Sequence, residues 1–570
     1  MIKDIVFSKV NNFWIDNGIV GLFKVLEHIK ENVIITDDSE NIIEYEITLS
    51  ADNLKIELTS NLVEDVESNE IDGNLIKILN EARNYLSDAY VSISTKKCRW
   101  FYKEKENEFV LFDKTSYKTH LRGTFFNAKP EYEGILYSPN TLKKEILDGN
   151  PKKLNMSNLV FEKFKEFKDS NKEIFEKKID SKERNEGFLN KPSKYTFGRM
   201  FSNDFVAKGS KICAFSGSKV KNTIEVNGMY SPIMTSSAGE INFASFLQKK
   251  PQISLLNSFI AVFAPYNLYY SLKIEDKKEI KNYFVLYDNN LKELSNFYNV
   301  IQMDLSTLRN QGYCNFTNLM YNLELEAETL FDFIISIYQQ VKGKLSKDER
   351  KGIYGKSIFT FTNDGNIFRD VKEYTSLATM FDFFDAFNES QDETLKFEQF
   401  LNLVRFFTKK MKTSKGDQYD TTWRNRLCSD LLHFRSIAKT IEWYFGEVKI
   451  KDKEPSSIYN LDKIISIYNN KTQFNMKSEM VEMCKSIGNR IGRHCRESDN
   501  KGILFSIRNA KNRVEFLNVL AESQFRTEVS YGEDFFKSLP DTPQWEEYKA
   551  LVSIFAMNSF LYKPDNKSTN

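Results

Sequence analysis

Apolar positions in the last third of the chain recur every three or four residues, the spacing that places side chains on one face of an α-helix. This period predicts helices over residues 377–388, 393–413, 422–446, 459–469, 477–496, 501–522 and 545–561. Together they predict an all-helical C-terminal bundle at residues 376–570.

The rest of the chain mixes the helical period with the two-residue alternation that is typical of strands. Alternating runs at 42–50 and 54–60 predict a β-hairpin. A turn-like Asp16-Asn17-Gly18 precedes an amphipathic helix. We therefore predict an α+β fold class, in which a mixed α/β N-terminal and central region precedes the bundle. This region comprises an α+β domain at 1–150 and a mixed continuation at 251–375 that joins the bundle near 345–376.

Two segments interrupt this mixed region. Lysines and acids alternate through residues 151–187, which favours a solvated helix and linker over a basic arm that binds nucleic acid. Residues 188–250 hold five glycines and many Ser, Thr and Asn residues, and they predict a loop-rich insertion with short strands. Between Val206 and Thr223 this insertion has no acid. Its flexible backbone and ammonium groups can hold phosphates, with Asn222 as a neighbour; the lysines are Lys208, Lys211, Lys219 and Lys221.

The helix expected over residues 477–496 has two different faces. Its apolar side is predicted to hold Met480, Cys484, Ile487, Ile491 and Cys495, and its basic side or flank Lys485, Arg490, Arg493 and Arg496. Gly488 and Gly492, one turn apart, indicate that either a neighbouring helix or a phosphate chain packs close to the backbone. The alternative for the basic side is a solvated face of a bundle helix.

Charge composition sets limits on where nucleic acid could bind. The 80 Lys and Arg residues balance 79 acids, so such a site must be a local patch. Ten of the 18 arginines lie between Arg405 and Arg526. Arginine binds phosphate or carboxylate with a planar fork, so this concentration indicates phosphate binding or, alternatively, interhelical ion pairs.

Residues that commonly carry catalysis are sparse. The four histidines form no metal-ligand pair, the six cysteines form no C-x-x-C pair, and no nucleophile motif is present. Asp382 and Asp385 could be drawn as a metal pair, but their surroundings are typical of an aromatic core helix. We expect no catalysis, metal or cofactor. The lack of a signal peptide or a long apolar run predicts a cytoplasmic protein without a membrane association.

Several segments resemble the large subunit of the type I CRISPR-Cas complex Cascade. They are WIDNGIVGLFKVLE, KYTFGRMFS, KICAFSGSK and IGNRIGRHCRESDNKGILFSIRNAKNRVEFLNVL. The similarity is to the I-B or I-A branch, which carries a C-x-x-C…C-x-x-C region. Here only Cys213 remains of those pairs. The resemblance therefore implies a degenerate zinc knuckle without zinc, which keeps its shape through packing.

The resemblance also implies a role and partners. The N-terminal part of such subunits recognises the protospacer-adjacent motif on target duplex DNA, and the helical bundle steadies the displaced strand. They sit beside the crRNA 5′ handle, a backbone subunit and small subunits, and a recruited helicase-nuclease cleaves the target. The C-terminal part can be made separately as the small subunit, for which Met411 and Met476 are candidate starts.

This role assigns further candidate contacts. Besides the lysine-rich loop at 206–223, a second duplex-binding loop would contain Asn127 and Lys129. The groove for the displaced strand would combine the basic residues of the 477–496 helix with others in the bundle, namely Arg405, Lys409, Lys410, Lys412, Arg424 and Arg426. Two alternatives remain: a structural scaffold that contacts crRNA or partner subunits, and a metal-dependent antiviral nuclease.

Overall fold

The computed structural model divides the chain into two compact units. Unit 1 comprises Met1–Cys314 and Ser357–Glu373, and unit 2 comprises Asn315–Lys356 and Tyr374–Asn570. The structure describes residues 2–59, 70–103, 108–119, 126–128, 134–137, 162–163, 165–166, 169–170, 200–226, 230–231, 251–275, 278–301, 314, 318–319, 323, 325–346, 350, 355–363, 368–390, 395–413, 416–450, 457–472, 476 and 478–562.

The long helix α1 organises the core of unit 1. It runs over Phe13–Asn32 and begins at Asn12, whose side chain accepts hydrogen bonds from the first backbone N–H groups. Asp16 and Asn17 lie inside this helix and are fully buried, so the expected turn there is wrong. The reason is tertiary: the Asn17 amide donates to the Leu286 carbonyl at 2.9 Å and accepts from the Tyr298 hydroxyl at 2.7 Å.

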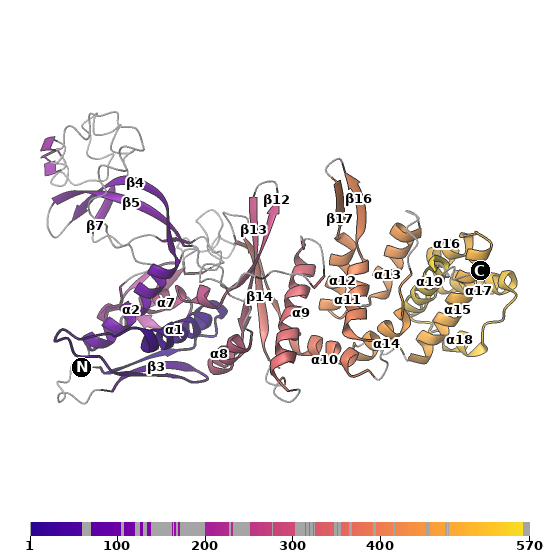
Figure 1. Cartoon of the computed structure of the whole chain (residues 1–570), viewed down its shortest axis with the longest axis horizontal. Helices are drawn as coiled ribbons and strands as arrows, with labels where there is room; N and C mark the ends of the chain where they lie inside the picture. The colour runs from indigo at the N-terminus through magenta and orange to yellow at the C-terminus, as the bar shows by residue number, and fades with distance from the viewer. Residues whose placement is uncertain are drawn as a thin grey trace, which may run out of the picture. The chain divides into compact units, whose positions relative to one another are not determined.

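Three antiparallel sheets accompany α1 in unit 1 (Figure 1). Their strand orders are β1-β3-β2, β12-β13-β14-β15 and β6-β5-β4-β7. The predicted hairpin is confirmed as the β2–β3 pair, in which Ile47 faces Ile56. The strand bounds are β1 Asp4–Ser8, β2 Tyr45–Leu49, β3 Asn53–Leu58, β4 Val91–Lys103, β5 Glu108–Thr119, β6 Phe126–Ala128, β7 Gly134–Tyr137, β12 Tyr269–Glu275, β13 Lys278–Tyr287, β14 Ser357–Asn363 and β15 Phe368–Tyr374.

Short elements complete unit 1. Two two-stranded ladders, β8–β9 and β10–β11, form the described part of the loop-rich insertion. Helix α7 follows β11 directly, and its first turn is capped by Ser254. The bounds are α2 Gly73–Tyr90, η3 Asn203–Phe205, β8 Lys211–Ile212, β9 Lys219–Val220, β10 Thr223–Glu225, β11 Gln252–Ser254, α7 Leu255–Ala261, η5 Ala264–Asn267 and α8 Leu291–Val300.

Unit 2 is a helical assembly with one projecting hairpin, β16–β17 (Figure 1). Clustered phenylalanines form part of its core; the rings of Phe383 and Phe400, for example, meet edge to face at 5.1 Å. The bounds are α9 Glu326–Lys344, α10 Leu377–Asn388, α11 Phe397–Phe406, β16 Lys409–Thr413, β17 Gly416–Asp420, α12 Thr422–Leu432, α13 Ala438–Tyr444, the π-helix η8 Phe445–Ile450, α14 Leu461–Lys471, α15 Ser478–Glu497, α16 Gly502–Asn509, α17 Arg513–Thr527, α18 Glu533–Ser538 and α19 Trp545–Leu561.

The mixed α/β fold class with a helical C-terminal region is confirmed. The helix expected over 393–413 ends at Phe406, and a β-hairpin follows, so the C-terminal region is not wholly helical. The predicted boundary also differs from the observed division. Residues 315–356, expected in the N-terminal continuation, belong to unit 2, where α9 packs on α12.

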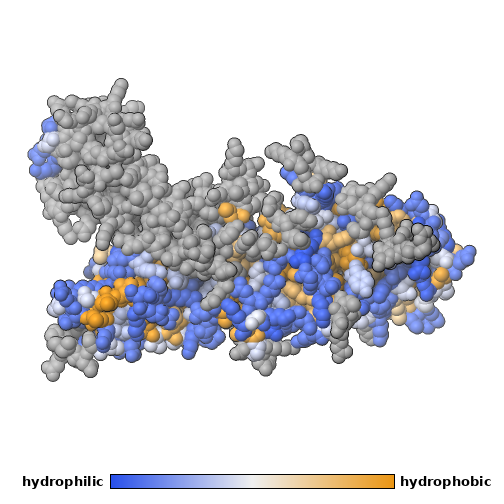
Figure 2. All heavy atoms as spheres, in the orientation of Figure 1, coloured by the Kyte–Doolittle hydropathy of each residue, from blue (hydrophilic) through white to orange (hydrophobic). Residues whose placement is uncertain are grey.

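On the face seen in Figure 2 the described surface is mainly hydrophilic, and one of its apolar patches lies over the N-terminal elements of unit 1. Exposed apolar residues of this region include Val6, Ile34 and Ile42. Among the helices that the structure describes, none is long and apolar enough to cross a membrane.

Candidate nucleic-acid interface

Helix α15 presents two arginines to solvent from a firmly held backbone. Its predicted apolar face is buried, as expected. Gly488 and Gly492 lie against α19 so closely that an added Cβ at Gly492 would stand 2.1 Å from the Ala556 carbonyl oxygen. The close neighbour indicated by the glycines is therefore a helix. On the outer side, Arg490 and Arg493 are exposed. Arg490 makes one long contact, 3.5 Å to the Ser530 carbonyl.

The other two basic residues of α15 are engaged within unit 2. Arg496 donates to the Ser559 and Tyr562 carbonyls at 2.8 and 2.9 Å, at the C-terminal end of α19, where a cation is favoured. Lys485 contacts Asp462 at 2.7 Å. Burial opposes its charge, but Asp462 and Glu482 outweigh this and raise the pKa of Lys485. Arg490 and Arg493 are therefore the α15 residues best placed to meet an external anion.

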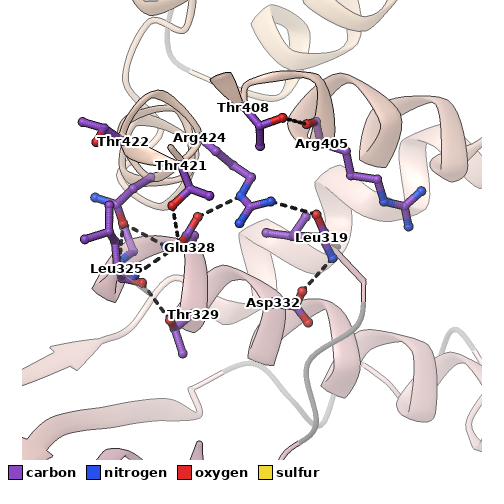
Figure 3. A network of polar contacts seen from close by, with 12 residues as sticks. Leu319, Leu325, Glu328, Thr329, Asp332, Arg405, Thr408, Thr421, Thr422 and Arg424 are labelled. Atoms are coloured by element: carbon purple, nitrogen blue, oxygen red, sulfur yellow. Dashed lines mark hydrogen bonds and ion pairs between the residues drawn. The ribbon is translucent and has the colours of Figure 1, made fainter. Parts of the chain in front are cut away.

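Arg424 corrects the expected groove, because its side chain is fully buried. Its Nε donates to Glu328 at 2.8 Å and its Nη1 to the Leu319 carbonyl at 2.9 Å, as Figure 3 shows. The Thr421 hydroxyl donates to the other Glu328 oxygen at 3.0 Å. Arg424 thus joins α12 to α9 and does not face solvent.

Arg405 is also largely occupied by internal contacts. Its Nε donates to the Asn318 carbonyl at 2.6 Å, and its guanidinium contacts the Glu398 carboxylate and the Asn402 side chain. The nearby Asp332 accepts from Asn318 and from the Leu319 N–H at 2.7 and 2.8 Å. Burial raises the pKa of Asp332 to about 6. These polar groups hold the chain near residue 318 against the helices.

The remaining predicted groove residues lie on or beside the β16–β17 hairpin. Lys409, Lys410 and Lys412 are in β16, and Lys410 pairs across the ladder with Tyr419. Arg426 is exposed on α12, which begins just after β17. Figure 1 places the hairpin and α15 at different points along the long axis of unit 2. The basic residues of the hairpin and those of α15 therefore lie on different parts of unit 2.

Sequence reasoning missed an aromatic component of the hairpin surface. The Arg426 guanidinium lies over the rings of Trp423 and Trp443, at 5.8 and 5.1 Å from their centroids. Trp443 is 46% exposed. The i, i+3 spacing of Trp423 and Arg426 could have indicated the first contact. Trp443 belongs to α13, so only the fold brings it to Arg426.

The lysine-rich loop of unit 1 is exposed. Lys208, Lys211, Lys219 and Lys221 are all solvent-facing, and Asn222 is half-buried. Lys221 lies 3.5 Å from Asp204. Gly209 packs against the backbone of Lys221, where an added Cβ would stand 2.5 Å from its Cα. The loop is thus folded tightly upon itself with its ammonium groups outward. Of the second predicted loop, Asn127 pairs with Lys118 in β6 and β5, whereas Lys129 is outside the described residues.

Cys213, which is buried between β8 and β9, is held through hydrogen bonds. Its sulfur accepts from the Ser254 N–H and the Asn257 side chain, both at 3.3 Å. Burial opposes ionisation of this thiol, but hydrogen bonds from Ser216 and Ser254 outweigh it and lower its pKa to about 7. No group of three or more His, Cys, Asp and Glu residues suited to a metal occurs within the described ranges.

Comparison with known proteins adds no assignment. No protein-family model matches the sequence, and no curated protein sequence is significantly similar to it.

Proposed function

We propose that this chain is the non-catalytic large subunit of a type I, I-B-like CRISPR RNA-guided surveillance complex, acting in the cytoplasm. In this role it reads the protospacer-adjacent motif in target duplex DNA and steadies the displaced strand for the helicase-nuclease. Its partners would be crRNA and the backbone, 5′-handle-binding and small subunits. The resemblance of four sequence segments to that family supports this role.

The observation that carries the nucleic-acid part of the proposal is the exposed pair Arg490 and Arg493. Residues three apart on a helix lie about 5–6 Å apart, so both guanidinium groups can contact one phosphate backbone. Their helix is fixed by its contact with α19, so little ordering of the backbone is needed on binding. The exposed lysine-rich loop of unit 1 supplies further cations for duplex phosphates.

The salt dependence of target binding tests this proposal. Replacing Arg490 and Arg493 with Ala in the reconstituted complex should weaken target binding and reduce the slope of log K against log salt by about 1–2, since each lost phosphate contact removes about 0.7–0.9. A matched control removes two cations that are paired with Glu522 and Glu533 (Arg526→Ala with Lys537→Ala). An equal slope for wild-type and the Arg490/Arg493 variant would contradict the assignment.

A further inference from the structure

The surface beside the β16–β17 hairpin contains an exposed tryptophan backed by a cation. Trp443 lies in α13, in the same exposed row as Lys439, whose ammonium pairs with Glu546 at 2.5 Å. Arg426 covers one face of the Trp443 ring. The residue is nevertheless 46% exposed, so part of it remains open to solvent. The ring therefore offers a flat surface to a ligand.

The tryptophan is held in place by its neighbour. The Tyr444 ring stacks on Phe407 at 4.4 Å between centroids, and its hydroxyl donates to the Phe406 and Thr408 carbonyls at 2.6 and 2.9 Å. These carbonyls immediately precede β16. Tyr444 thus ties the end of α13 to the base of the hairpin, so Trp443 has a fixed position next to it.

Positive charge lies close to this ring, although Glu546 pairs with Lys439 and the hairpin aspartates Asp417 and Asp420 stand opposite Lys412 and Lys409. Arg426 is exposed, and the hairpin that rises from the same base carries Lys410 opposite the half-exposed Tyr419. A flat aromatic face beside cations is the combination by which proteins bind single strands, because the base stacks while the cation contacts phosphate. Trp and Arg are also enriched at the centres of protein–protein interfaces, so a protein contact at Trp443 is the competing outcome of the test.

We propose that Trp443, backed by Arg426, is a stacking platform for an unpaired nucleobase of a single strand, whose phosphates pass along the β16–β17 hairpin. This inference rests on the proposed function and makes it specific, since it assigns a base-stacking residue to strand binding. Strand binding through this platform is sequence-tolerant, because every base has a π-face.

The test measures single-strand affinity and the site of cross-linking. The full chain is titrated with a labelled oligothymidine, and a parallel sample with 5-iododeoxyuridine is irradiated and digested for peptide mapping. Trp443→Ala should lower single-strand affinity about 5- to 150-fold, as expected for the loss of one stacked base. Trp443→Phe should restore most of it, and the wild-type cross-link should map to the peptide that contains Trp443.

A matched control and the contrary outcomes keep the test decisive. Tyr459→Ala removes another exposed aromatic ring of unit 2, 75% exposed, and should leave affinity unchanged. Suppose that the wild-type chain binds the single strand. If Trp443→Ala binds it with the same affinity, or if Tyr459→Ala loses as much affinity as Trp443→Ala, the stacking platform is overturned and the proposed function stands. A Trp443→Ala chain that binds the strand normally but no longer joins its partner subunits makes Trp443 a protein contact. A wild-type chain that binds no nucleic acid, alone or in the complex, overturns both proposals.

Discussion

Arg424 and Arg426 are two residues apart on α12 and occupy opposite environments. Arg424 is buried against Glu328, and Arg426 is exposed over Trp443. Arg424→Ala would leave the Glu328 carboxylate buried without its cation, which costs about 3–5 kcal/mol. Arg426→Ala removes the same charge from the surface and should cost less than about 1 kcal/mol. Urea denaturation of both variants measures the difference, and equal midpoints would contradict the assigned roles.

The sequence contained part of this distinction. Arg424 precedes the apolar Leu427, Cys428 and Leu431 by three, four and seven residues, the spacing of one buried helix face. The helical period of the sequence alone could therefore have distinguished Arg424 from the exposed arginines. Its partner could not, because Glu328 lies 96 positions away and only the packing of α9 on α12 brings them together.

Asp16 gives unit 1 a pH-dependent contribution to stability. Burial raises its pKa from 3.8 to about 6. Between about pH 4 and 6 the folded protein therefore binds a proton that the unfolded chain has lost, so lowering the pH through this window stabilises the fold. Asp16→Asn keeps an oxygen for the Val10 N–H and cannot titrate. When the pH is lowered from 7 to 5, we expect the free energy of unfolding of the wild-type protein to rise by about 1 kcal/mol relative to that of this variant.

Thermal unfolding at the two pH values measures this gain. The relevant quantity is the difference between the two proteins at each pH, since other groups titrate in both. A difference that is the same at pH 5 and pH 7 would show that the Asp16 carboxylate is already ionised throughout this range.

At the scale of elements, the contact between α15 and α19 depends on two glycines. Gly492→Ala would place a Cβ 2.1 Å from the Ala556 carbonyl oxygen, in backbone that cannot give way cheaply. We expect the helices to separate and the free energy of unfolding to fall by about 1–3 kcal/mol, as in overpacked cores. Gly343→Ala is the matched control, because nothing lies within 4 Å of its added Cβ in α9 and alanine favours a helix by about 1 kcal/mol.

Melting temperatures of the two alanine variants check this prediction. Gly492→Ala should melt below wild-type and Gly343→Ala at or above it. If the Gly492 variant melts like wild-type, α15 is not held by its contact with α19, and the exposed arginines lose their fixed support.

Long, strongly periodic elements were predictable from sequence, and their interruptions were not. The periods at 377–388 and 545–561 match α10 and α19 end for end. The helix predicted over 393–413 was too long, since β16 begins at Lys409. Lys409 and Lys410 lie in a β-hairpin, but two lysines in sequence are equally compatible with the polar end of a helix. In the candidate site, exposure of Arg490 and Arg493 followed from the period, whereas the Arg426–Trp443 contact depends on how α12 meets α13.

At the scale of the whole molecule, unit 2 is assembled from two stretches of sequence. Residues 315–356 precede the strands β14 and β15, and the chain returns to unit 2 at Tyr374. A pattern read in order along the chain assigns α9 to the preceding region, because no local signal marks a helix that packs on a later segment.

This assembly predicts how a separately translated C-terminal product would behave. A chain that starts at Met411 begins inside β16 and lacks α9. Its Arg424 would then keep a buried position without Glu328, at a cost of about 3–5 kcal/mol. We expect residues 411–570 to show weak near-ultraviolet circular dichroism and rapid proteolysis. Residues 315–570 contain α9. We expect this fragment to give a strong near-ultraviolet circular dichroism signal and to be digested slowly. If 411–570 proves as well folded as 315–570, the Glu328–Arg424 pair does not hold unit 2 together. A start at Met411 could then supply a stable small subunit.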